Sequence, residues 1–355
     1  MTPVFSGLLI GLLVGYFTRR ARLCSFGAIE SALVGQDWRR MKVFGLALGV
    51  ALLLSQTLAL TGLIDPAQST YAHARVPWLA TAVGATLFGL GMALVGTCAF
   101  GSLIRLGSGD MRSLIVLIVF GAVAYAVLRG VLAPLRIDLF ERVTVDLPAS
   151  MQGTFASLMT ALAGKTGAAL LAGLCAMALV FTAVLDGRLW RAPKLMTAGL
   201  VLGLGVVAGW AATGLMDDEF AVQRRLQSLT FVAPVARGLY GMMLGTPGWL
   251  DFGVASVVGV TAGSGLAARM AGDFRWEAFD DPTEMRRHLL GAVLMGLGGV
   301  LAGGCTIGQG LSAASLTALT APIAIAGMML GARLGILLLV EGSLRDILAH
   351  YLGRR

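Results

Sequence analysis

Three of the four cysteines in this chain of 355 residues stand in the same setting, a Cys-x-Phe/Ile-Gly segment. They are Cys24 in "LCSFGA", Cys98 in "TCAFGS" and Cys305 in "GCTIGQ". A thiol is a weak hydrogen-bond donor on a polarisable sulphur atom, which suits a large, soft anion better than a hard, hydrated one. We therefore interpret the three thiols as successive contacts for a sulphur-containing anion. Cys175 lacks the glycine turn, and we expect it to be a packing residue.

This role requires thiols that carry no charge. A thiolate 4 Å from a single negative charge repels it by about 4 kcal/mol at an effective dielectric near 20, and a divalent anion suffers roughly twice that repulsion. Apolar surroundings raise the pKa of a cysteine, whereas a helix N-terminus lowers it. We expect desolvation to dominate, so that the thiols remain neutral donors.

Other kinds of cysteine chemistry have less support. No C-x-x-C pair is present, so neither a zinc site nor a thioredoxin-like centre is indicated. A membrane sulphur-transfer protein that uses cysteine persulfides needs activated thiolates, and none of the three histidines lies near a motif. A passive anion channel whose cysteines only pack is a further alternative. Since no Walker A motif appears either, we expect a transporter and not an enzyme, with no cofactor.

The composition indicates an all-α polytopic membrane protein. Hydrophobic residues make up 57% of the chain and charged residues 13%, whereas about a quarter of a soluble domain is charged. The net charge of +8 does not indicate nucleic-acid binding, because the basic residues fall between apolar runs, where the positive-inside rule places them. The first apolar run, 4–17, lacks a basic segment before it and does not resemble a cleaved signal peptide.

Apolar runs of about 20 residues predict about nine membrane-spanning helices. Their ranges are 4–18, 42–63, 78–96, 112–132, 167–185, 195–215, 250–271, 288–303 and 321–341. Five shorter apolar pieces are predicted as re-entrant or interfacial helices, at 24–35, 98–107, 152–163, 228–245 and 305–319.

The basic segments predict the orientation in a bacterial inner membrane, with the N-terminus outside and the C-terminus inside. Segments 19–42, 186–194 and 345–355 are cationic, 133–166 mixes both signs, and 272–287 supports its inside placement only weakly. The cationic residues that predict the inside segments are Arg19, Arg20, Arg22, Arg39, Arg40, Lys42, Arg188, Arg191 and Lys194. The segment of mixed charge contains Arg136, Arg142, Lys165, Asp138, Glu141 and Asp146.

A shift of 207 residues places segment 84–101 on segment 291–308 with ten of eighteen positions identical, including Cys98 on Cys305. The same shift brings Cys24 to Thr230 and Phe231. We predict two inverted repeats, 1–166 and 195–355, joined by a linker helix within 167–194. Inverted repeats with a central site formed by broken helices are a recurring plan of transporters.

Each motif follows a small-residue turn at which a second short helix is expected to begin. A helix that starts inside the membrane presents free N–H groups and a partial positive charge, which favour an anion. The residues expected to contact the anion, besides the three cysteines, are Ser25, Phe26, Gly27, Gly96, Thr97, Phe100, Gly101, Thr230, Phe231, Gly303, Gly304, Thr306, Gly308 and Gln309. Glu30, Arg237 and Arg333 are candidates for a charge role, with Arg237 either attracting the anion or pairing with Glu30. The glycines 89, 91, 296, 298 and 299 are expected to pack helices.

The motifs "RLCSFGAIES", "LVGTCAFGSLIRLGSG", "SLTFVAP" and "LAGGCTIGQGLS" resemble those of the YeeE/YedE family of bacterial sulphur transporters, over essentially the whole chain. The resemblance implies an hourglass-like helical fold with inverted halves. It also implies thiosulfate uptake along three cysteines that match Cys24, Cys98 and Cys305, and a cytoplasmic partner similar to TusA-type sulphur carriers. Since some members handle selenium or other sulphur species, a selenium or sulfite permease is the alternative within the family.

Overall fold

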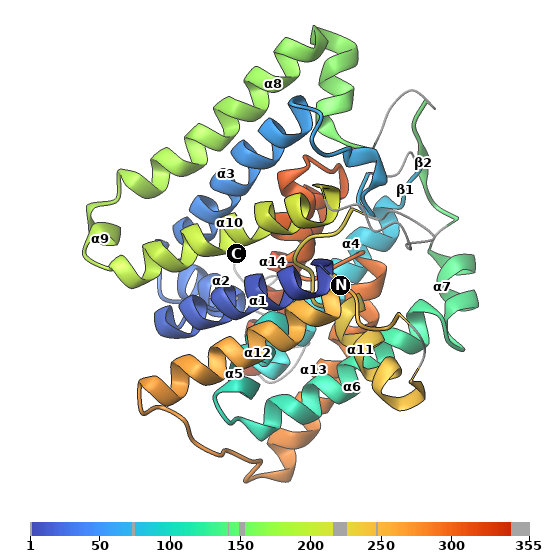
Figure 1. The fold of residues 1–355 in the computed structure, drawn as a ribbon. Helices are drawn as coiled ribbons and strands as arrows, with labels where there is room; N and C mark the ends of the chain where they lie inside the picture. The colour runs from blue at the N-terminus through green and yellow to red at the C-terminus, as the bar shows by residue number, and fades with distance from the viewer. Residues whose placement is uncertain are drawn as a thin grey trace, which may run out of the picture.

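The fold is almost entirely helical, as Figure 1 shows for the computed structural model of the chain. The structure describes residues 2–72, 75–140, 142–148, 153–215, 226–245 and 248–341. His73, Glu141, His350 and the cationic tail 345–355 lie outside these ranges. The α-helices are α1 (Thr2–Ala21), α2 (Ser25–Leu33), α3 (Arg39–Leu60), α4 (Trp78–Val95), α5 (Ala99–Gly107), α6 (Met111–Leu128), α7 (Ala133–Leu139), α8 (Phe155–Val184), α9 (Gly187–Trp190), α10 (Pro193–Leu215), α11 (Ala233–Leu244), α12 (Phe252–Met270), α13 (Pro282–Leu301) and α14 (Thr320–Glu341). Two short helices, η1 (Pro66–Gln68) and η2 (Gly308–Ala313), and an antiparallel pair of two-residue strands, β1 (Arg75–Val76) and β2 (Val145–Asp146), complete the fold.

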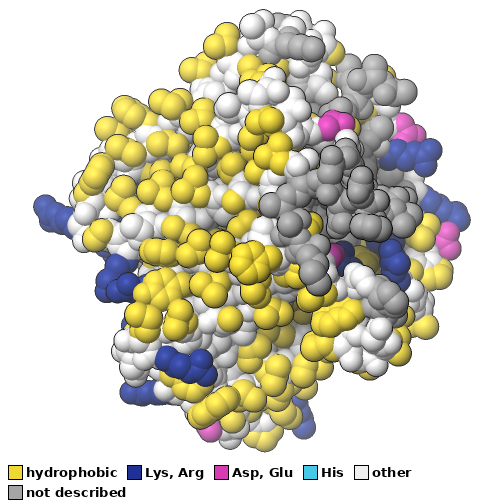
Figure 2. Space-filling model, in the orientation of Figure 1, with side chains coloured by type: hydrophobic (Ala, Val, Ile, Leu, Met, Phe, Trp, Pro, Cys, Tyr) yellow, Lys and Arg dark blue, Asp and Glu magenta, His cyan; other side chains and the backbone are white. Residues whose placement is uncertain are grey.

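Among the described residues, eight segments are long and apolar enough to cross a membrane. They are Pro3–Leu33, Arg39–Leu60, Trp78–Gly107, Met111–Leu128, Thr166–Val184, Pro193–Leu215, Phe252–Met270 and Thr320–Glu341. The predicted span 288–303 is also helical, within α13, but the first turns of α13 carry Glu284, Arg286 and Arg287, so it is not among the eight. Figure 2 shows hydrophobic side chains over most of the face in view, with Lys and Arg mostly toward its margins. The predicted class, an all-α polytopic membrane protein, is confirmed.

The short apolar pieces form short helices in most cases. Segments 24–35, 98–107 and 228–245 contain α2, α5 and α11, and 305–319 contains η2. Segment 152–163 differs, because from Phe155 on it forms the first part of α8, which continues into the predicted linker helix across a kink at Gly164, where φ is 75°. Glycine tolerates this left-handed backbone conformation, so the helix can bend there without ending.

The long helices pack in a reciprocal way between the two halves of the chain. α1 packs along α12 as α10 packs along α3, and α4 packs along α14 as α13 packs along α6. In addition, α4 packs on α13 and α1 on α10. Exchanging α1, α3, α4 and α6 with α10, α12, α13 and α14 therefore reproduces the same set of contacts. Two halves related by an approximate twofold axis would give this pattern, and the inverted repeat itself remains a prediction.

The glycine stripes lie at helix interfaces, as expected. A Cβ on Gly298 of α13 would lie 2.5 Å from the carbonyl oxygen of Gly84 of α4 and would also clash with the backbone of Phe88. On α4, a Cβ on Gly91 would lie 2.6 Å from the carbonyl oxygen of Gly291. These glycines allow the two helix backbones to approach closely, which is how helices associate where both are surrounded by lipid.

The loops collect on two opposite faces of the bundle. On one face, the loops before α4, after α6 and before α11 surround a cavity that includes Tyr71, Arg129 and Gln227. On the other face, Arg22 pairs with Asp273 at 3.3 Å, and Arg112 pairs with Glu277 and Glu284. We name these the cavity face and the opposite face.

Candidate functional site

Each of the three motif cysteines stands where a short helix or turn begins. Cys24 and Cys98 occupy the N-cap positions of α2 and α5, with extended backbone. The Sγ atom of Cys98 accepts a hydrogen bond from the backbone N–H of Gly101 at 3.3 Å, and that of Cys305 accepts one from Gly308 at 3.4 Å. The spacing of the motif therefore has a local cause, because a side chain at an N-cap reaches the N–H groups two or three residues later.

The thiols of Cys24 and Cys98 lie side by side although 74 residues separate them in the sequence. Their side chains are in hydrogen-bonding contact, and the Sγ atom of Cys24 lies 3.4 Å from Oγ1 of Thr97. Gly101 makes this approach possible, since a Cβ there would lie 3.2 Å from the Cys24 sulphur and closer still to the Thr97 hydroxyl. Cys98 is fully buried, whereas Cys24 is half-buried.

Two contacts connect Cys305 to this pair. The hydroxyl groups of Ser25 and Thr306, the residues after Cys24 and Cys305, lie 3.0 Å apart. The rings of Phe100 and Phe231 stack with their centroids 5.0 Å apart, and the backbone N–H of Phe231 donates to the Cys305 sulphur. Residues from all three Cys-x-Phe/Ile-Gly segments, together with Thr230 and Phe231, thus meet in one buried centre. Cys175 lies apart from it, exposed on α8.

A cavity of about 440 Å³ opens from the cavity face toward this centre. Gly303, Gly304, Gln309, Thr230 and Arg237 line it, and Cys305 follows Gly304 directly as a fully buried residue. None of the three cysteines lines the cavity itself. The described residues therefore form a vestibule that ends next to Cys305.

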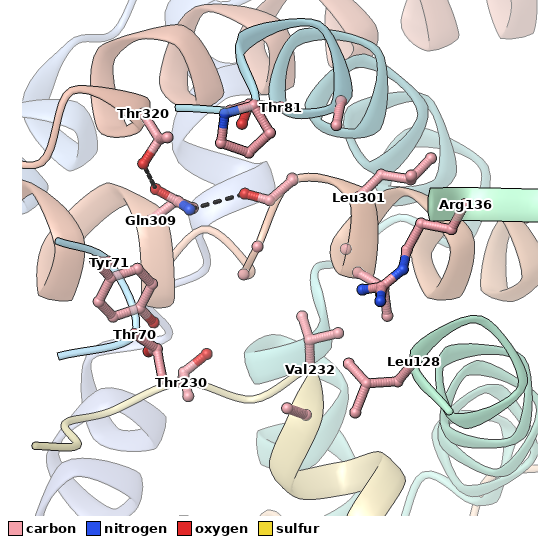
Figure 3. Close-up of a pocket in the computed structure, with 18 of the residues that line it drawn as sticks. Thr70, Tyr71, Thr81, Leu128, Arg136, Thr230, Val232, Leu301, Gln309 and Thr320 are labelled. Carbon is pink, nitrogen blue, oxygen red and sulfur yellow. Dashed lines mark hydrogen bonds between the residues drawn. The ribbon is translucent and has the colours of Figure 1, made fainter. Parts of the chain in front are cut away.

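Gln309 is fixed at the inner end of the vestibule. Its Nε2 atom donates to the carbonyl oxygen of Ala302 at 2.8 Å, and its Oε1 atom accepts from Thr320 at 3.2 Å, as Figure 3 shows. Gln309 is only 2% exposed, and Gly303, at φ 72°, turns the chain beside it. Since an amide nitrogen has two N–H groups, one remains to donate to a ligand in the cavity.

Tyr71 and Thr230 form the adjoining wall of the vestibule (Figure 3). Burial raises the pKa of the Tyr71 phenol, so its hydroxyl group keeps its proton and can donate to an anion. Gly308 packs against both residues, because a Cβ there would lie 2.5 Å from Oγ1 of Thr230 and 3.1 Å from the Tyr71 hydroxyl oxygen. Gly308 therefore has two roles: it leaves room for Thr230 and Tyr71, and its N–H donates to the Cys305 sulphur.

The charge of the vestibule is positive. Four arginines line it, Arg75, Arg129, Arg136 and Arg237, and no carboxylate is among its described lining residues. Arg237 pairs with Asp251 at 2.7 Å instead of Glu30, and the exposed Arg75 pairs with Asp146 at 3.3 Å. A cleft lined by one sign of charge raises the local concentration of ions of the other sign.

Two candidate charges lie elsewhere. Glu30 is exposed on α2, and Arg333 is exposed on α14; neither lines the vestibule. Conversely, the sequence interpretation missed Tyr71, Arg75 and Arg129 as site residues and used Arg136 only for topology. Tyr71, Arg75 and Arg129 lie outside every motif, and no sequence signal marks them; only Arg136, on α7, belongs to the basic residues of segment 133–166.

We expect the substitution Gln309→Glu to raise the half-saturating concentration of a transported anion by about tenfold or more. Two unit charges 5 Å apart repel by about 3 kcal/mol at an effective dielectric near 20. The defect should lessen as the pH is lowered, because protonation removes the added charge. Gln56→Glu is the matched control, since Gln56 binds the Ser315 carbonyl away from the vestibule. Equal uptake by both variants at neutral pH would contradict a role of the vestibule in anion entry.

A family model described as sulphur transport matches residues 20–334. The thiosulfate transporter TsuA of Escherichia coli (strain K12) is 28% identical over 354 residues, which cover 92% of each chain. The thiosulfate transporter TsuA of Spirochaeta thermophila is 26% identical over 342 residues, which cover 92% of this chain and 96% of that protein.

Proposed function

The chain belongs to the sulphur transport family, and on that premise we propose that it carries thiosulfate across the cytoplasmic membrane into the cell. The names of both similar proteins support thiosulfate as the substrate. The observation that carries the proposal is the vestibule with four arginines, which ends one residue from the buried thiol of Cys305. We place the cavity face outside, because Arg19 and Arg20 in the last turn of α1, and Arg22 directly after it, lie on the opposite face, and cationic helix ends belong inside.

The proposed path runs through the three thiols in space, not in sequence order. The anion enters the vestibule, where the arginines, the Tyr71 hydroxyl and the free N–H of Gln309 replace part of its hydration shell. It then meets the Cys305 thiol, passes the stacked pair Phe100 and Phe231, and reaches Cys98. Cys24, which is half-buried, releases it toward the opposite face.

Neutral thiols are the central physical requirement of this relay. A thiol donates weakly, so each step holds the anion loosely enough to release it to the next. Ser102, buried one turn after Cys98, has a hydroxyl group with no partner among the described residues and would supply one further donor. No covalent bond to sulphur is needed, and the protein acts as a carrier instead of an enzyme.

Persulfide transfer is the competing mechanism, because Cys24 and Cys98 are in contact. It needs a base beside the thiolate. The described histidine, His288, lies instead on α13 beside Glu284 and Phe279. The geometry therefore favours the hydrogen-bonded relay.

The direction of transport requires a driving force. Moving a divalent anion inward against an inside-negative potential costs about 4.6 kcal/mol per 100 mV. We propose that consumption of thiosulfate in the cytoplasm maintains the inward flux, with a TusA-like sulphur carrier as the receiving partner. A selenium or sulfite permease is the alternative for the same site.

Uptake of labelled thiosulfate into proteoliposomes tests the proposed substrate. We expect saturable uptake that unlabelled thiosulfate suppresses and an equal concentration of sulfate does not. Sulfite and selenite are included as competitors, because stronger competition by either would assign the alternative substrate. Equal competition by sulfate would overturn the preference for a soft sulphur anion.

A further inference from the structure

An apolar groove of about 680 Å³ runs between α5, α6, α11 and α12, away from the vestibule. Figure 1 shows these four helices in the lower part of the bundle. Exposed side chains such as Ile118 and Val258 line its walls, and Val258 is 49% exposed. The hydroxyl group of Thr261, which also lines the groove, is used within its own helix, where it donates to the Val257 carbonyl at 3.0 Å. The walls therefore offer apolar contact along most of the groove.

In the first half of the chain, the matching surface on α3 is covered by the linker part of α8. On α3, Gly45 and Gly49 face Leu179, Val180 and the backbone of Ala176 on α8. The pairing of helices gives the register between α3 and α12. Val43 and Ala47 of α3 contact glycines 199 and 203 of α10, as Ser256 and Val260 of α12 contact glycines 11 and 15 of α1.

Gly7 of α1 likewise contacts Phe252, so these contacts allow an offset of 209 or 213 residues between α3 and α12. Both offsets place Gly45 and Gly49 on residues that line the groove, Val254 and Val258 or Val258 and Ala262. The face that α8 covers on α3 is thus left open on α12. The two glycines that allow α8 to approach closely are replaced there by larger residues, so this face of α12 is less suited to helix packing.

The groove ends at an arginine on the opposite face. The guanidinium of Arg269 lies 4.9 Å from the centroid of the Phe274 ring, and a Cβ on Gly265 would lie 3.7 Å from its Nη1 atom. Both Phe274 and Gly265 line the groove, so the guanidinium lies against its wall. The neighbouring carboxylates of Asp273 and Glu277 pair with Arg22 and Arg112. Among the described residues, none lies within ion-pair distance of Arg269.

We propose that this groove binds a glycerophospholipid, with an acyl chain along α6 and α12 and its phosphate at Arg269. An elongated apolar tail with an anionic group at one end matches an apolar groove that ends at one unpaired guanidinium. From Val254 to Arg269 the groove follows α12 for 15 residues, or about 22 Å at 1.5 Å per residue. This exceeds half the hydrocarbon core, about 15 Å, so one leaflet's acyl chain fits its length.

An acyl chain suits this face better than a helix does, because α12 carries larger residues where α3 carries Gly45 and Gly49, the glycines that let α8 approach closely. A flexible chain does not need such a close approach of two backbones. Arginines on the cytoplasmic side of membrane helices are also common contacts for lipid head groups.

Lipid retention by the purified full-length protein tests this site independently of transport. Palmitoyl-oleoyl phosphatidylglycerol is added to delipidated protein in detergent, and bound lipid is counted by native mass spectrometry. We expect one tightly bound lipid in the unchanged protein. Arg269→Gln should lower the bound fraction about fivefold or more, as expected for loss of a charged hydrogen bond. Ala262→Phe, which fills the groove, should lower it as strongly.

Leu204→Phe is the matched control, because Leu204 is an exposed apolar residue on α10, away from the groove. The Leu204→Phe variant should retain the lipid. In the unchanged protein, inorganic phosphate should not displace the bound lipid. Elution as a single species shows that each variant is folded, and Arg269→Gln alone suffices if Ala262→Phe fails this check. Unchanged retention in Arg269→Gln would overturn the site. So would displacement by inorganic phosphate, or a concentration-dependent dimer of the unchanged protein that Ala262→Phe abolishes.

Discussion

Thiosulfate uptake should fall by about tenfold or more when Cys98 or Cys305 is replaced by alanine. Each thiol is fully buried at the meeting point of the three motif segments, and alanine removes the donor without adding bulk. Losing one hydrogen bond to a charged partner costs about 1.5–3 kcal/mol, and each 1.4 kcal/mol changes a rate or affinity tenfold. The measurement is initial uptake into proteoliposomes that contain equal amounts of folded protein. Cys24→Ala is expected to have the same direction of effect.

Serine substitutions and Cys175 provide the controls. Cys→Ser keeps a donor but removes the nucleophile, so the relay predicts partial uptake in the serine variants. Complete loss in serine and alanine variants alike would favour persulfide chemistry or packing that only sulphur satisfies. Cys175→Ala should transport normally, since Cys175 is exposed on α8. Full uptake by the triple alanine variant would leave only a passive channel.

Gly298→Ala should destabilise the protein strongly, although it adds only one methyl group. Its Cβ would lie 2.5 Å from the Gly84 carbonyl oxygen and would clash with the Phe88 backbone, and backbone atoms cannot rotate away. Overpacking costs about 1–3 kcal/mol, and contact with backbone places this variant at the upper end. At about 2 °C per kcal/mol for a large chain, the apparent melting temperature should fall by about 6 °C in detergent.

Gly173→Ala is the matched control for that substitution. Gly173 lies within α8, and nothing lies within 4 Å of the Cβ it would gain. Alanine is favoured over glycine inside a helix by about 1 kcal/mol, so this variant should melt at an unchanged or slightly higher temperature. A fall equal to that of Gly298→Ala would mean that glycine itself, and not the α4–α13 contact, sets the stability.

The prediction of the fold was most accurate where local composition decides the outcome. An apolar run of membrane length spans the lipid, and there it must be helical, because unpaired backbone groups are costly in lipid. Accordingly, α3, α6, α10, α12 and α14 lie close to their predicted ranges. The sequence predicts segment 152–163 as a separate short helix, because its apolar run is too short to span a membrane. A glycine with positive φ can join two helical pieces, and sequence alone does not distinguish this kink from a helix end.

In the candidate site, too, the local contacts could be predicted from the sequence and the contacts between distant residues could not. The Cys-x-Phe/Ile-Gly spacing is local, and the N–H bonds to Cys98 and Cys305 follow from it. The arginines of the vestibule carry no such signal, because they come together only when segments far apart in the sequence, among them β1, α7 and α11, fold around the cavity. Arg237 pairs with Asp251 of the neighbouring α12 N-terminus and not with Glu30, because the fold places Glu30 elsewhere.

By itself, the sequence determined that the chain is helical and membrane-spanning, that its halves share a motif, and that three thiols head short turns. These properties depend on hydrophobic run length and on hydrogen bonds between residues a few positions apart. Only the tertiary structure decided that Cys24 touches Cys98, that the vestibule stops beside Cys305, and that α8 covers α3 while α12 stays open. The physical reason is that these contacts join residues far apart in the sequence, and helix packing, set by backbone approach at glycines, brings them together.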